Sequence, residues 1–129
     1  MRWLYVLHVV GAILVCVSVT MLSALGFSIY YNDAGLAPLF TSVVVSLAAG
    51  AGLYFVWRKP EGYVVSHREG MAVVALGWAA AGLAGALPFW FADMLPSFTD
   101  CVFESVSGFT TTEASVLANI EAAPRGLLF

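Results

Sequence analysis

Three long stretches of this chain contain no acidic or basic residue, histidine aside, and they limit what the chain can fold into. They cover residues 3–30, 38–57 and 71–92. As α-helices, which rise 1.5 Å per residue, they would be about 42, 30 and 33 Å long. Each is long enough to cross the hydrocarbon core of a bilayer, which is about 30 Å thick. The sequence therefore predicts three transmembrane helices.

The composition agrees with a chain whose solvent is largely lipid. Charged residues make up 10% of the sequence and hydrophobic residues 61%, whereas a soluble domain carries about a quarter charged residues. The net charge of -3 comes with no basic patch that could hold nucleic acid. The first apolar run exceeds the about 7–15 residues of a signal-peptide core, so we expect it to be retained as a membrane helix.

Three chemically reactive side chains lie in these apolar stretches or close to them. Cys16 and Cys101 belong to no pair with metal-ligand spacing, and we expect both to be small core residues. His8 lies within the first predicted span, near its start, where it could reach the interface. With no second histidine nearby in sequence, we do not expect His8 to bind a metal or haem.

The basic residues of the loops predict the orientation. Arg2 precedes the first span, and Arg58, Lys59 and Arg68 fall in the second connection, whereas 31–37 and 93–123 contain no lysine or arginine. Cytoplasmic loops carry an excess of lysine and arginine. We therefore expect the N-terminus and the 58–70 loop in the cytoplasm, and 31–37 and 93–123 outside.

Small residues spaced four apart predict close packing of the second and third spans. Ala48 and Gly52 form one such pair, and Ala81 and Gly85 form another. Small residues allow helix backbones to approach closely in lipid, where the hydrophobic effect does not drive helix association. The pattern predicts a tight bundle and is not specific for any activity.

A short helix is expected after the third span. Ser97, followed three residues later by Asp100, is a helix N-cap signal, and Gly108 is a plausible stop. About ten residues between them would give roughly 15 Å of helix, half the thickness of the membrane core. Apolar segments of this length are candidates for re-entrant segments.

Thr110, Thr111 and Thr112 follow this short helix directly. A helix that enters from outside would point its C-terminal end, which carries partial negative charge, at the middle of the membrane. Threonine oxygens placed there could replace the water shell of a cation. A surface loop whose threonines make local hydrogen bonds remains an alternative interpretation of the same residues.

The segment closely resembles the first pore loop of the Trk/Ktr/HKT superfamily of potassium transporters, in its TrkH branch. Its most specific feature is the run Ser107-Gly108-Phe109 followed by three threonines. The resemblance also covers residues 66–70, 75–78, 97–100, 103–106, 114–117, 119–121 and 124–129. Where family members usually have glycine after the threonines, this chain has Glu113.

This resemblance implies an all-α membrane fold and roles for particular residues. Residues 1–58 would form two added helices, 59–70 a cytoplasmic loop, and 71–129 the opening helix, the pore loop and the start of a further helix in one of four pore repeats. Thr110, Thr111, Thr112 and Glu113 would form the selectivity filter. Support from the pore helix would come from Glu104, Ser107 and Gly108.

The function expected from the resemblance is potassium uptake across the inner membrane, with this chain supplying one pore loop. The expected partners are the other repeats, a second copy and a cytosolic nucleotide-binding regulatory subunit. No cofactor is expected besides the transported K⁺, and no enzyme, because Glu104 and Glu113 have no accompanying nucleophile or metal set. A small non-conducting membrane protein that regulates other subunits is the alternative.

Overall fold

The computed structural model describes residues 3–32, 36–57, 61–62, 64–111 and 114. Four helices account for most of them: α1 (Trp3–Tyr31), α2 (Leu36–Val56), α3 (His67–Phe91) and α4 (Phe98–Phe109). No strand occurs within these ranges. The all-α prediction is confirmed.

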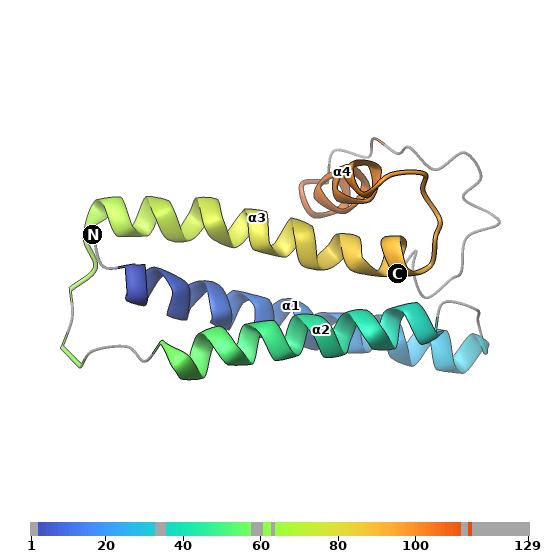
Figure 1. Cartoon of the computed structure of the whole chain (residues 1–129), viewed down its shortest axis with the longest axis horizontal. Coiled ribbons are helices and arrows are strands. Elements are labelled where there is room, and N and C mark those ends of the chain that lie inside the picture. The colour runs from blue at the N-terminus through green and yellow to red at the C-terminus, as the bar shows by residue number, and fades with distance from the viewer. Residues whose placement is uncertain (1–2, 33–35, 58–60, 63, 112–113, 115–129) are drawn as a thin grey trace.

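The three long helices are apolar and long enough to cross a membrane, as the uncharged stretches predict. They run alternately up and down (Figure 1): the start of α1, the end of α2 and the start of α3 lie at one end of the bundle. The end of α1, the start of α2 and the end of α3 lie at the other. This alternation agrees with the alternation of basic and non-basic connections in the sequence.

α1 and α2 cross where a glycine of each helix meets the other backbone. A methyl group at Gly11 would lie 2.7 Å from the Tyr54 backbone nitrogen and 2.9 Å from the Gly50 carbonyl oxygen. One at Gly50 would lie 2.9 Å from the backbone nitrogen of Val15 and 3.0 Å from the Gly11 carbonyl oxygen. Any side chain at either position would therefore force the two backbones apart.

The face that α2 uses for packing differs from the predicted one. Ala48 and Gly52 are exposed, and nothing lies within 4 Å of a methyl group built on Gly52. The buried small residues are Ser42, Ser46 and Gly50, which are also spaced four apart. The predicted spacing of small residues occurs at the contact, but on nearly the opposite face of the helix, because small residues occur on both faces.

α3 begins about one turn before the predicted start at Met71. The backbone N–H of Ser66 donates to Glu69 Oε2 at 3.0 Å, one half of a capping box. Glu69 is only 1% exposed, so the first turn of α3 is both capped and packed. Residues 67–70, which the sequence assigned to the cytoplasmic loop, therefore belong to α3.

α3 contains Pro88 in its last turn and ends in a Schellman motif. The Met94 N–H donates to the Phe89 carbonyl at 3.2 Å, and the Asp93 N–H donates to that of Trp90 at 3.1 Å. Asp93 has the left-handed backbone angle that this motif requires, with φ of 53°. The motif stops the helix and lets the chain reverse its direction.

The structure separates the two cysteines and gives His8 a partner. Cys101 is fully buried beside Ala86 and Leu95, as predicted, but Cys16 is exposed and is not a core residue. Nδ1 of His8 lies 3.0 Å from the carbonyl oxygen of Tyr54, and the two rings stack with centroids 4.4 Å apart. His8 therefore belongs to the contact between α1 and α2.

Candidate pore loop

The candidate site begins with the N-terminal cap of α4, as predicted. The Ser97 hydroxyl accepts a hydrogen bond from the Asp100 backbone N–H at 3.2 Å. Asp100 lies in the first turn, where a negative charge interacts favourably with the helix dipole. The residues that predicted a helix start here therefore do form one.

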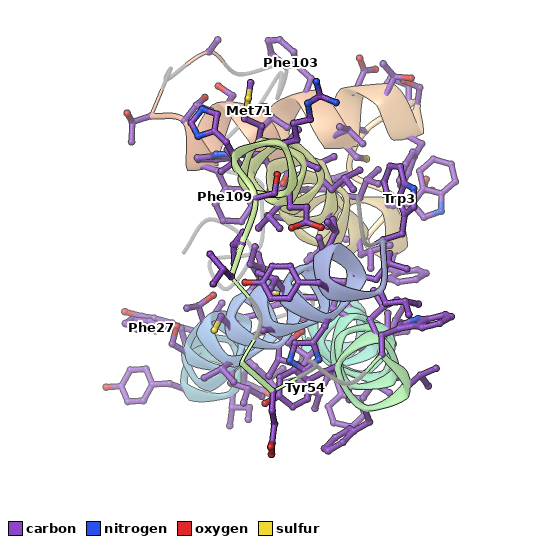
Figure 2. All side chains as sticks on the ribbon, turned by 90° about the vertical axis from the view of Figure 1, so that its left-hand side faces the viewer. Trp3, Phe27, Tyr54, Met71, Phe103 and Phe109 are labelled. Carbon is purple, nitrogen blue, oxygen red and sulfur yellow. The ribbon has the colours of Figure 1, made fainter. Side chains whose placement is uncertain are left out.

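α4 runs back along the helix that precedes it. Its first residue, Phe98, contacts Trp90 of α3 with ring centroids 5.5 Å apart. Further along α4, Ser105 lies against Gly85, and Val106 lies against Gly82. Phe109, the last residue of α4, also lies against Gly85. Helix α4 therefore turns back over the second half of α3 and crosses it at a large angle, as Figure 2 shows in a view along α3.

The end of α4 lies near the middle of α3. Helix α4 has 12 residues, or about 18 Å, and Gly82 is only a few residues from the midpoint of α3. α4 lies on the side of α3 away from α1 and α2 (Figures 1 and 2). A short helix that starts beyond the end of a long apolar helix and turns back over it has the arrangement of the re-entrant segment that the sequence predicts.

The helix ends one residue later than predicted. Gly108 is inside α4, and Thr110 is the C-cap. The Val106 carbonyl accepts both the backbone N–H of Thr110 at 2.9 Å and its hydroxyl at 2.8 Å. The helix thus continues past Gly108 because Thr110 donates two hydrogen bonds to the Val106 carbonyl, which lies in the last turn.

Thr111 carries the unusual backbone geometry of the site. Its φ is 55°, and its N–H donates to the Gly108 carbonyl at 3.3 Å. The other non-glycine residues with positive φ in the described ranges are Asn32 and Asp93, types that tolerate this region, whereas a β-branched threonine is an outlier there. Position 113, where family members usually have glycine, lies outside the described residues.

The three residues predicted to support the filter are all on α4. Ser107 is buried, and its hydroxyl donates to the Ala114 carbonyl at 2.5 Å, which ties the chain after the threonines to the last turn of the helix. Glu104 is half-buried and Gly108 is exposed. Their supporting role remains a prediction.

Only part of the predicted filter can be located. Thr110 and Thr111 follow the last turn of α4 and are exposed, with Phe109 before them (Figure 2). Thr112 and Glu113 lie outside the described residues. That these four residues form a filter is likewise a prediction.

The contacts that hold α4 against α3 could not be predicted from the sequence. The pair Ala81 and Gly85 predicts close packing of the third span, but not which helix packs against it. Gly77 faces Ile13 of α1, whereas Gly82 and Gly85 face α4. The hydroxyl of Ser105, which meets Gly85, is buried and has no hydrogen-bond partner in the part of the chain that the structure describes.

The fold and the site together define a segment of a multi-pass membrane protein with a re-entrant pore-loop helix. In sequence, the chain is 36% identical over its full length to the Trk system potassium uptake protein TrkH of Vibrio parahaemolyticus. It is 35% identical to TrkH of Escherichia coli K12, and 28% identical over 96% of its length to TrkG of the same organism. It spans 27% of the length of the two TrkH proteins.

In structure, the chain is similar to the crystal structure of the potassium transporter TrkH from Vibrio parahaemolyticus. The TM-score is 0.90 at 37% identity, over 100% of this chain and 28% of that one. No family model matches the chain. The predicted resemblance to the TrkH branch is confirmed in both sequence and fold.

Proposed function

We propose that this chain supplies one re-entrant pore loop to a potassium transport path. The observation that carries the proposal is that α4 turns back over α3 and ends at Thr110, with its last turn against Gly82 and Gly85 of α3 and not at the end of that helix. The proteins that it resembles over its whole length are potassium transporters by name.

The proposed chemistry follows from the end of α4. The C-terminal end of a helix carries about half a negative elementary charge, which favours a cation near it. Carbonyl oxygens beyond that end can replace the hydration shell of an ion. The Thr110 hydroxyl donates to the Val106 carbonyl, so its oxygen keeps lone pairs that can face an ion. Backbone oxygens of residues 110–113 are the proposed ion ligands, and the transported K⁺ is the only ion required.

The proposed orientation places the N-terminus and the connection between α2 and α3 in the cytoplasm of an inner-membrane protein. Arg2 and the basic residues of the second connection support it through the positive-inside rule. α4 then enters the membrane from the outside, and its negative end faces the inside of the bilayer.

The proposed partners follow from the resemblance. One re-entrant loop supplies one wall of an ion path, so three further repeats are needed to enclose an ion. A second copy of the subunit and a cytosolic nucleotide-binding regulatory subunit are the other partners. Large apolar side chains exposed on the described helices, among them Phe40, Phe55 and Phe103, provide surfaces for lipid or for these repeats.

A chimera tests the proposal. The chain replaces the matching 27% of Vibrio parahaemolyticus TrkH, and potassium uptake is measured in cells that lack their own uptake systems. We expect growth at low potassium and uptake within about tenfold of the parent transporter. A matched chimera in which Thr110, Thr111 and Thr112 are alanine should insert equally well but take up at least tenfold less potassium. Equal uptake by both chimeras would contradict the proposal.

A further inference from the structure

Two glycines of α3 form a contact surface for α4, and these contacts lead directly to Thr110. A methyl group at Gly82 would lie 2.8 Å from Cγ2 of Val106. One at Gly85 would lie 2.7 Å from Cε2 of Phe109 and would overlap the hydroxyl oxygen of Ser105. These separations are too short for real carbon contacts, so an alanine at either position would force the side chains of α4 that face it, or α4 itself, to move.

The hydroxyl of Ser105 is the second observation. Ser105 is 6% exposed, and its oxygen has no hydrogen-bond partner among the described residues, although leaving a buried hydroxyl unpaired destabilises the folded state. It lies directly against Gly85. The fit between the two helices is therefore close enough to leave a polar atom unpaired at their contact.

The contact leads to the candidate filter through hydrogen bonds already described. The Val106 side chain meets Gly82, and the Val106 carbonyl accepts both hydrogen bonds of Thr110. The Phe109 ring meets Gly85, and Phe109 is bonded to Thr110 along the chain. A displacement of α4 from α3 therefore moves Thr110 directly.

We infer that Gly82 and Gly85 are positioning residues for the ion path: they set the depth and distance at which α4 presents Thr110. The inference rests on the proposed function, because it assumes that Thr110 borders the path. Neither glycine touches the ion in this account. Their effect passes through Val106 and Phe109.

The first measurement uses the chain itself in detergent micelles or lipid nanodiscs. Gly85→Ala should speed hydrogen exchange at the Thr110 amide about tenfold. Gly70→Ala is the matched control: it is in the same helix, but nothing lies within 4 Å of the added methyl group. Adding Ser105→Ala to Gly85→Ala removes one of the overlapping atoms and should recover at least half of the lost protection.

The second measurement uses the chimera with the matching part of TrkH and compares potassium with sodium uptake at equal expression. Gly85→Ala should lower the preference for potassium about tenfold, Gly70→Ala should not, and Ser105→Ala should partly rescue Gly85→Ala.

A purely structural defect would lower the uptake of both ions alike and would contradict the inference. Unchanged Thr110 exchange in Gly85→Ala would also overturn it. If the unsubstituted chimera takes up no potassium, the proposed function fails, and the exchange data alone decide whether Gly85 positions Thr110.

Discussion

Gly11→Leu is expected to separate α1 from α2 and to destabilise the chain by about 3 kcal/mol. The first carbon of the new side chain would already lie 2.7 Å from the backbone nitrogen of Tyr54 and 2.9 Å from the carbonyl oxygen of Gly50. Backbone atoms within a helix cannot rotate away as a side chain can, so the helices must move apart. His8, one turn earlier, would then lose its contacts with Tyr54.

The control is Gly26→Leu on the same helix, where nothing lies within 4 Å of an added methyl group. Both variants replace glycine by leucine in the same apolar helix. They differ in that only position 11 lies where α1 crosses α2. Unfolding by SDS in mixed micelles, followed by tryptophan fluorescence, gives the two stabilities.

Gly50→Leu should cost about as much as Gly11→Leu, since it faces the same crossing from α2. The double variant should cost clearly less than the sum of the two, because one substitution already opens the contact. Additive effects, or a Gly11→Leu variant as stable as Gly26→Leu, would show that the helices do not cross at this point.

Glu113→Gly is expected to increase the selectivity of the chimera for potassium over sodium by about tenfold, or about 1.4 kcal/mol. A carboxylate beside the path attracts both cations and adds no discrimination. Glycine also adopts either sign of φ without strain, which would free the backbone oxygen to face the ion. The measurement is the relative uptake of the two ions before and after the change.

Glu113→Gln separates the charge from the backbone. It removes the carboxylate charge but keeps a side chain, so a selectivity gain shared by both variants would be electrostatic. A gain confined to glycine would come from backbone freedom. Unchanged selectivity and flux in both variants would mean that position 113 does not border the path.

Sequence patterns predicted the helices well because the membrane imposes strong rules on them. The limits of α1 and α2 lie within two residues of the limits of the uncharged stretches. The predicted start of α3, Met71, was one turn too late. The polar residues 67–69 favoured a loop, although Ser66 and Glu69 have the sequence pattern of a capping box. The end of α4 was misplaced because a glycine is a common helix stop, yet two hydrogen bonds from Thr110 extend the helix past Gly108.

Packing partners could be predicted less well than helices. A glycine in an apolar helix permits a close contact, but the amino-acid sequence does not indicate which helix packs against it. Gly11, Gly77 and Gly85 meet α2, α1 and α4 respectively, while Gly52 meets nothing in the described part of the chain. The short helix of the candidate site, by contrast, could be predicted because Ser97 and Asp100 form a local capping signal, while the role of the threonines as a filter stays a prediction.

In the proposed function, α4 enters the membrane from the outside and presents Thr110 to a potassium path. The most direct test places a cysteine at position 110 of the chimera, with Cys16 and Cys101 replaced by alanine. A small membrane-impermeant thiol reagent is then applied to either side of the membrane. We expect reagent from the outside to block uptake, and saturating potassium to slow that block at least fivefold, because the ion and the reagent compete for the same place. Block only from the cytoplasmic side, or a rate that potassium does not change, would contradict the account.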